Sequence, residues 1–330
     1  MIGFYAHHHG SGHMTRCRAL AAELSVTHST AILSSRDDAE VVLPLDAPAS
    51  AGLTPAQLTA HGVLHWAPPG HRGLADRMAA IATWIQEHRP AAFHVDVSVE
   101  VAVLVRAMGV PVTVQAMPGH RPDAPHMLGY SLADAVIAAW PRWVPVPEHL
   151  AHVADRVHQV GGISRFPTGD LDLPPASSTR PRVVIMFGTG GTDSPEGYWD
   201  DVVTHLNLAG FDCTVIGGRT WVPDPRNLLE RADVIITAAG QNSVADVAAL
   251  GRRAVVVAQE RPFQEQEATA RILREAGLAV TADSVAGQVT PVRQWEHLVR
   301  EALDLRPDWH RWETQGAVQR AAHVIREVAG

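Results

Sequence analysis

A run of three histidines, His7–His9, and a fourth, His13, behind a Gly-Ser-Gly turn are the residues of this chain best suited to chemistry. A neutral imidazole accepts a proton near neutral pH, so each can serve as a general base. The apolar run Ile2–Ala6 before them predicts a strand, and the apolar spacing after them predicts a helix. Ligands of α/β folds lie beyond the carboxyl ends of strands. The stretch therefore predicts a ligand site whose histidines, His13 among them, could act as a base.

Asp96 ends another predicted strand, Ala92–Val97, and we expect its carboxylate to orient His13. Capping of the following helix is the alternative role for a strand-end aspartate. If His7–His9 continue the first strand, their side chains alternate between its faces, and two of the three border the site. Three adjacent strand residues cannot all reach one ion, so the sequence predicts no metal site.

Other histidines are expected to contact the acceptor, that is, the substrate whose proton a histidine base would take, or to lie on the surface. His8 and His9 are the expected acceptor contacts of the first loop, together with His120 of a later loop. His61 and His65 have helical spacing and are expected to form a surface pair. They fall in a Pro-, Gly- and His-rich segment, residues 44–72, which predicts a long loop with one short helix from Thr54.

Two small-residue turns in the second half follow predicted strands and precede predicted helices, an arrangement whose free amides can bind a diphosphate. The alternative is a tight turn that needs glycine for its own geometry. Asp246, one turn into the second helix, is expected to bind a ribose diol, and the polar run from Gln259 to Glu267 suits sugar hydroxyls. A solvated acidic helix start is the other interpretation of that run. The turn residues are Gly188, Thr189, Gly190 and Gly191, and Gly240, Gln241, Asn242 and Ser243.

Composition excludes several classes of function. The formal net charge of -8 gives no basic surface for nucleic acid. All 27 basic residues are arginine, so Schiff-base lysines and the P-loop lysine are absent. Cys17 and Cys213 have no metal-ligand spacing and are expected to be small buried residues in a reducing, cytoplasmic environment. No stretch is apolar enough to span a membrane, although peripheral membrane contact stays open.

Apolar runs alternate with helical patterns along all 330 residues, which predicts an α/β protein with parallel sheets. We expect a first domain over residues 1–163, a linker over 164–181 and a second domain over 182–308. The final helix, Trp309–Val328, belongs to a segment, 309–330, expected to cross back to the first domain. The predicted strands are Ile2–Ala6, Thr30–Ser34, Ala92–Val97, Pro111–Gln115, Ala135–Ala139, one near residues 157–163, Arg182–Phe187, Phe211–Ile216, Val234–Thr237, Ala254–Ala258 and Leu278–Thr281.

Essentially the whole chain resembles the GT-B nucleotide-sugar glycosyltransferases, family 28 above all, and the most specific part of the resemblance lies in the second half. The ordered series that carries the resemblance runs from Ala232 to Ser243, through the strand Ala254–Ala258, to Gln266–Ala270 and Leu273–Gly277. The resemblance implies a GT-B fold, that is, two Rossmann-like domains whose parallel sheets face a central cleft. Three departures, Asp246 for the usual Glu, Glu265 for a common Gln and Thr269 for an Asn, bear on the donor sugar.

Family 28 also implies which residues bind the donor. Gly188–Gly191 would face the diphosphate, Trp221 and Val222 the base, Asp246 the ribose, and Glu265 with Gln266 the sugar. Arg165 resembles the family's linker arginine, and Gly12 belongs to the glycine-rich loop that ends in His13. The implied activity is inverting, metal-independent transfer from a nucleotide-sugar, UDP-sugar first, to a small-molecule, lipid or glycan acceptor, with no other cofactor.

The stretch Gly10–Cys17 is similar to the loop of the UDP-sugar hydrolase of the pseudaminic acid pathway. That resemblance implies that the histidine activates water instead of an acceptor hydroxyl. A nucleotide-sugar hydrolase or epimerase is therefore one alternative, and a non-catalytic nucleotide-sugar-binding partner subunit is another. The donor sugar, the acceptor and the oligomeric state are left open by the sequence.

Overall fold

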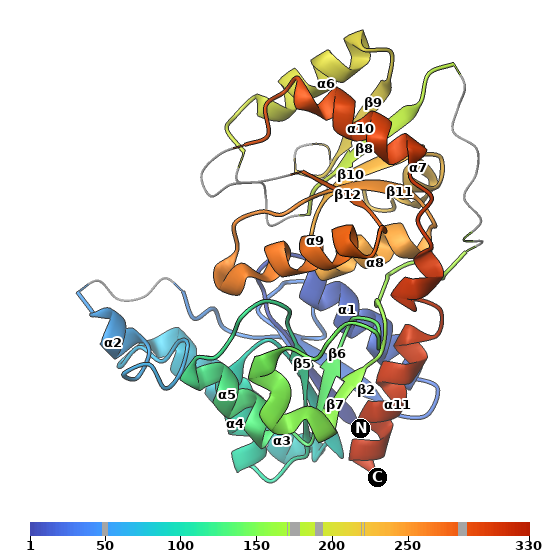
Figure 1. Ribbon diagram of the computed structural model, residues 1–330. Coiled ribbons are helices and arrows are strands. Elements are labelled where there is room, and N and C mark those ends of the chain that lie inside the picture. Colours follow the sequence, from blue (N-terminus) through green and yellow to red (C-terminus); the bar gives the residue numbers. More distant parts are fainter. Residues whose placement is uncertain are drawn as a thin grey trace. The chain divides into compact units, whose positions relative to one another are not determined.

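A computed structural model describes residues 1–47, 52–169, 171, 179–188, 194–218, 220, 222–282 and 289–330. The chain divides into two compact units, and each is described by itself (Figure 1). Unit 1 comprises Met1–Ala139, Pro145–Val160 and Val318–Gly330, and unit 2 comprises Trp140–Val144 and Gly161–Ala317. The C-terminal residues therefore belong to the same unit as the N-terminus.

Unit 1 is built on a seven-stranded parallel sheet of order β3-β2-β1-β4-β5-β6-β7. Strand β1 pairs in register with β2 on one side and β4 on the other, so it lies near the middle of the sheet. All five residues of β1, and of β4, are buried, as expected for parallel strands covered on both faces. The strands are β1 Ile2–Ala6, β2 Thr30–Ser34, β3 Val41–Val42, β4 Ala92–Asp96, β5 Val112–Ala116, β6 Ala135–Ala138 and β7 Val157–Gln159.

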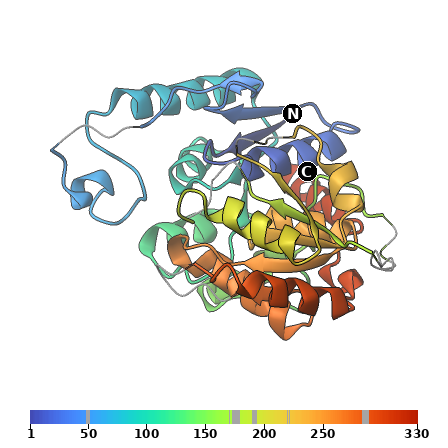
Figure 2. The same cartoon turned by 90° about the horizontal axis from the view of Figure 1, so that it is seen from above.

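The helices of unit 1 cover both faces of this sheet. Helices α3, α4 and α5 pack side by side on one face, whereas α1 and α11 lie together on the other, where Gln319 donates to Glu23 (Figure 1). Helix α2 projects away from the sheet in both views (Figures 1 and 2) and buries no residue. The helices are α1 Gly12–Leu24, α2 Pro55–Leu58, α3 Arg72–His88, α4 Val99–Ala107, α5 Ala124–Leu132, η1 Glu148–Arg156 and α11 Ala317–Ala329.

Unit 2 has a five-stranded parallel sheet of order β12-β11-β10-β8-β9. Alternate residues of β8 point to opposite faces: Val183 packs with α6 and α10, and Val184 packs with α8 and α9. Figure 1 shows these two helix pairs on the two faces of the sheet. The elements are β8 Arg182–Met186, α6 Tyr198–Leu208, β9 Asp212–Ile216, α7 Arg226–Glu230, β10 Val234–Ala238, α8 Gln241–Ala249, β11 Arg253–Val257, η2 Pro262–Gln264, α9 Glu265–Glu275, β12 Val280–Ala282, α10 Gln294–Asp304 and η3 Trp309–Trp312.

The predicted α/β class with parallel sheets is confirmed, two local predictions are wrong, and one strand was missed. The final helix is two pieces, because Glu313 and Gly316 have left-handed backbone and interrupt it. His61 and His65 do not share a helix, since α2 ends at Leu58 and His61 has a positive φ of 59°. The short strand β3 was not predicted. None of the described helices is long and apolar enough to cross a membrane.

Candidate active site

The candidate site of unit 1 lies where the order of the sheet reverses. The chain leaves β1 toward β2 on one side and reaches β4 on the other, so the loops after β1 and β4 open a crevice at the carboxyl edge. The backbone N–H of His7 donates to the carbonyl oxygen of Asp96 over 3.3 Å, which joins the two loops. Helix α1 begins at Gly12, so His13 lies in its first turn.

The structure brings His13 and Asp96 together. Nδ1 of His13 lies 2.9 Å from Oδ1 of Asp96, and the carboxylate is fully buried whereas the imidazole side chain is 20% exposed. An ionised carboxylate only accepts hydrogen bonds, so His13 donates from Nδ1, and in the neutral imidazole the lone pair then lies on Nε2. That tautomer is the one a general base needs.

Arg16 completes this arrangement, and sequence reasoning missed it. Its Nε donates to Oδ2 of Asp96 over 2.7 Å, and its Nη2 donates to Oδ1 over 2.7 Å. Burial alone would raise the pKa of the Asp96 carboxyl, but the Arg16 charge and the hydrogen bonds from His13 and Arg16 hold it well below its usual range. The signal for Arg16 was its position, three residues after His13 on the same helix face.

The alternation expected for His7–His9 is wrong, because β1 ends at Ala6 and the three residues form a bend. Their rings gather: the His7 and His8 rings stack with centroids 4.7 Å apart and an angle of 16°, and the His8 and His9 centroids are 4.5 Å apart. Potential ligand nitrogens of the three lie within 4.8 Å of one another. Lone pairs of imidazoles lie in the ring planes, so the rings of His8 and His9, each stacked nearly parallel to that of His7, do not converge with it on one ion.

His7–His9 also border a cavity of about 360 Å³ in unit 1, and the His7 ring lies edge-on to that of His13, with centroids 6.0 Å apart. Burial and the neighbouring imidazoles lower the pKa of His7 to about 3. Burial, with His9 and Arg77 nearby, also lowers the pKa of His8. Both rings are therefore neutral at neutral pH.

His65 borders the same cavity and belongs to a second group that the sequence did not reveal. Its Nε2 lies 3.2 Å from Oδ1 of Asp123, and Nδ1 of His126 lies 2.7 Å from Oδ2 of the same carboxylate. Arg121 contacts Nε2 of His126 over 3.1 Å. His120, predicted to bind the acceptor, is exposed and lines neither this cavity nor a smaller one that His65 and His126 border.

In unit 2 the sheet order reverses between β8 and β10, and the predicted donor turns follow these strands. Gly188 comes just after β8, and Gly240 precedes α8. No described atom lies within 4 Å of the position that a Cβ would occupy at either glycine, and φ of Gly240 is an ordinary -69°. Local crowding and backbone geometry therefore do not explain these two glycines. Asn242 and Ser243 lie, half-buried, in the first turn of the helix that Gln241 begins.

Asp246 has partners within unit 2. It accepts from the Ser164 hydroxyl over 2.7 Å, and from the backbone N–H and the Nε of Arg165 over 3.2 and 2.8 Å. Burial raises the pKa of the Asp246 carboxyl, against the opposing effect of Arg165 and these hydrogen bonds. The side chain is 4% exposed, so ribose binding by Asp246, which stays a prediction, requires an exchange of these partners.

Gln266 connects two loops of the same edge. Its side-chain oxygen accepts from the backbone N–H groups of Ala239 and Gln259 over 3.2 and 3.0 Å. Glu265 is half-buried in the first turn of α9, and Val222 packs against the core. Thr189, Gly190, Gly191 and Trp221 lie outside the described residues.

Comparisons with known proteins agree with this architecture. Residues 203–289 match the glycosyltransferase family 28 C-terminal domain. No curated protein matches the chain.

Solved structures share the fold over the whole chain. Acinetobacter baumannii MurG is 16% identical, with a TM-score of 0.63 and 99% of each chain covered. Phytolacca americana UGT2, complexed with UDP-2fluoro-glucose and pterostilbene, is 15% identical, with a TM-score of 0.61, 99% of this chain and 93% of that chain covered. The spinosyn rhamnosyltransferase SpnG, complexed with thymidine diphosphate, is 15% identical, with a TM-score of 0.60, 99% and 96% covered.

The chain is therefore a GT-B fold protein. Residues 203–289 of its second unit match the family 28 C-terminal domain, so in that part the chain is similar to family 28, as the resemblance of its sequence implied.

Proposed function

We propose that the protein is an inverting glycosyltransferase that moves a sugar from a nucleotide-diphosphate donor, a UDP-sugar first, to a hydroxyl-bearing acceptor. The family 28 domain and the GT-B fold support glycosyl transfer. The single observation that carries the mechanism is the contact between His13 Nδ1 and the buried Asp96, which leaves Nε2 as the base. Solved relatives of the fold are complexed with a UDP-sugar analogue or with thymidine diphosphate, which supports this donor class.

In the proposed reaction, Nε2 of His13 takes the proton of the acceptor hydroxyl, and the oxygen attacks the anomeric carbon. The bond from that carbon to the diphosphate oxygen breaks, and the nucleotide diphosphate leaves with the electron pair. Asp96 stabilises the imidazolium that forms, and Arg16 keeps Asp96 ionised. The amides after β8 and at the start of α8 are proposed to bind the diphosphate without a metal ion. The open space at Gly188 and Gly240 supports close approach of a ligand to this backbone.

We expect His13→Ala to lower kcat by about 100- to 10,000-fold, the usual contribution of a general base, and to leave nucleotide affinity unchanged. Nucleotide release from UDP- and dTDP-sugars measures the first effect, and calorimetric titration with UDP measures the second. His61→Ala, an exposed histidine of the same unit, is the matched control and should keep full activity. Full turnover of His13→Ala at saturating donor would refute the role of His13.

Hydrolysis is the second candidate, because Gly10–Cys17 is similar to the loop of a UDP-sugar hydrolase. In that reaction the same Nε2 activates water. Incubation with a UDP-sugar and no acceptor separates the two: stoichiometric release of UDP and free sugar at the rate seen with acceptor would replace transfer by hydrolysis.

A further inference from the structure

The cavity beside His7–His9 has two kinds of wall. One wall carries the three stacked histidine rings, and the other carries the larger apolar side chains Trp66, Leu74 and Met78. Its volume of about 360 Å³ falls within the usual range of small-molecule sites. The cavity lies wholly in unit 1, and the ring of His7, one of its lining residues, lies edge-on to that of the candidate base His13 with centroids 6.0 Å apart.

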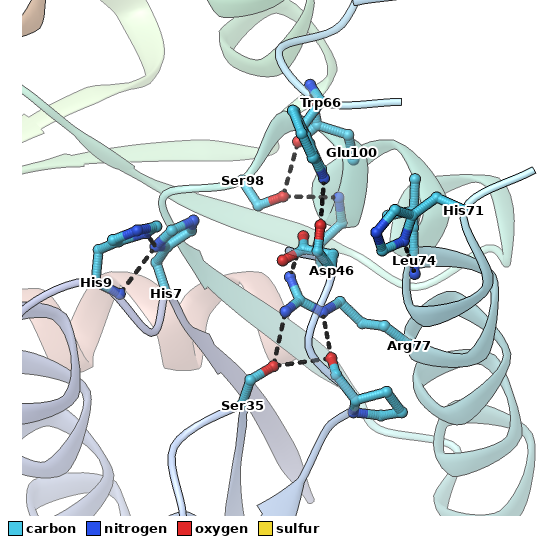
Figure 3. A network of polar contacts seen from close by, with 12 residues as sticks. His7, His9, Ser35, Asp46, Trp66, His71, Leu74, Arg77, Ser98 and Glu100 are labelled. Carbon is cyan, nitrogen blue, oxygen red and sulfur yellow. Dashed lines mark hydrogen bonds and ion pairs between the residues drawn. The ribbon is translucent and has the colours of Figure 1, made fainter. Parts of the chain in front are cut away.

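Arg77, the arginine among the described lining residues of this cavity, already has hydrogen-bond partners. Its side chain is 2% exposed. Its Nη1 donates to Oδ2 of Asp46 and to the Tyr5 hydroxyl over 3.2 Å, and its Nη2 donates to the Ser35 hydroxyl over 2.7 Å. Its Nε donates to the carbonyl of Pro44 over 3.0 Å. Figure 3 shows the guanidinium between Asp46 and Ser35. With these partners, little of its charge is available to a ligand.

Glu100, the second carboxylate of the lining, fixes the backbone of the wall that carries Trp66. One of its oxygens accepts from the backbone N–H groups of His65 and Trp66 over 2.7 and 3.0 Å, and the other accepts from the Ser98 hydroxyl over 3.0 Å. The Trp66 indole in turn donates to the carbonyl of Asp46 over 2.8 Å (Figure 3). The aromatic wall is therefore held by the carboxylate of Glu100 and by the backbone carbonyl of Asp46.

These contacts decide the charge that the cavity can accept. The lining holds two carboxylates and one arginine, and the arginine is bound to one of the carboxylates. The rings of His7 and His8 are neutral, because burial lowers the pKa of each. A phosphate or carboxylate placed here loses its hydration and meets Asp46 and Glu100, and the arginine that could offset its charge is already paired with Asp46. An uncharged ring system loses only water from apolar and aromatic surface.

We propose that this cavity binds the acceptor and selects an uncharged, ring-bearing hydroxyl compound, and that it rejects acceptors with a phosphate group. The inference rests on the proposed function in naming the ligand an acceptor. Because His7 lines the cavity and also contacts His13, the acceptor hydroxyl is expected on the His7 side of the cavity, the side nearer to the base. The ring stacks between the histidine wall and Trp66.

The test uses three naphthalene compounds on the full chain without any donor, by isothermal titration calorimetry. 1-Naphthol is expected to bind at least about tenfold more tightly than 1-naphthyl phosphate, because the phosphate adds like charge near the carboxylates. Equal binding, tighter binding of the phosphate or of 1-naphthylmethylamine, or no binding of 1-naphthol would overturn the proposal. UDP titration is a separate measurement, so failure of nucleotide binding would count against the proposed function and leave this result standing.

Two variants with matched controls test the location. Met78→Trp should fill the cavity and abolish 1-naphthol binding, whereas Ala79→Trp, exposed on the next position of α3, should not. Asp46→Asn frees Arg77 and should narrow the preference for naphthol over naphthyl phosphate by about tenfold. Asp76→Asn, an exposed partner of Arg72 on α3, should leave the preference unchanged. A Met78→Trp variant that melts like the wild type and still binds naphthol would place the site elsewhere.

Discussion

At the residue scale, Arg16 decides the state of the buried Asp96. Burial raises the pKa of that carboxyl, and without an opposing charge the group would take up a proton. It would then no longer offer His13 a charged hydrogen-bond acceptor. The planar guanidinium of Arg16 stabilises the ionised carboxylate with two hydrogen bonds, one to each of its oxygens. Arg16 is therefore a positioning residue: it acts on the reaction through Asp96 and His13.

We expect Arg16→Met to lower the free energy of unfolding by about 3–5 kcal/mol, because it leaves a buried carboxylate without its cation. Arg18→Met is the matched control two residues along the same helix. Its partner Asp38 is exposed, so the cost should be about 0–1 kcal/mol. Urea unfolding followed by circular dichroism measures both. Similar losses for the two variants would show that burial of the Arg16 pair carries no special weight.

The sequence predicts those site residues whose positions depend on the ends of neighbouring strands and helices. His13 and Asp96 were found because one lies at a predicted helix start and the other at a predicted strand end, the two places that border the crevice of an α/β sheet. The bend at His7–His9 could not be predicted, because the strand ends one residue before it and only tertiary contacts set the rings together. The pair of His65 with Asp123 is separated by 58 residues, and no local pattern reveals such a contact.

At the scale of elements, the buried strands were predictable and the helix ends were not. Runs of β-branched residues fix strands such as β8 and β10 within a residue or two. The break between η3 and α11 depends on Glu313, which carries a φ of 52° without being glycine, so its residue type gives no warning. The turn before α9 has the same character, since Phe263 and Gln264 both have left-handed backbone.

That turn yields an element-scale prediction. Gln264 is exposed and has a φ of 54°, so Gln264→Gly removes backbone strain and should stabilise the protein by about 0.5–1 kcal/mol. Glu267→Gly, three residues later in regular α9, should destabilise it by a similar amount, because glycine has the larger unfolded entropy. Chemical denaturation of both variants measures the change in the free energy of unfolding, which should be positive for Gln264→Gly and negative for Glu267→Gly. Destabilisation by Gln264→Gly would mean that its side chain, not its backbone, governs the turn that leads to Glu265 and Gln266.

At the scale of the whole molecule, several histidines are buried in neutral form. Burial lowers the pKa of His94, His126 and His149 to about 4 and that of His7 to about 3. In the unfolded chain each binds a proton near pH 6.5. Asp246 has the opposite effect, because burial raises the pKa of its carboxyl. The histidines outnumber it, so they set the sign of the pH dependence below neutrality.

The free energy of unfolding should therefore fall as the pH falls from about 6.5 toward about 4, because the unfolded state then binds protons that the folded state refuses. Each histidine contributes a slope of up to about 1.4 kcal/mol per pH unit in this window. Urea unfolding across the window measures the slope, and His94→Gln should reduce it, since His94 is fully buried against Thr113. His323→Gln, 63% exposed on α11, is the control and should keep the wild-type slope. A flat wild-type profile over this range would mean that the buried rings bind protons as readily in the folded chain as in the unfolded one.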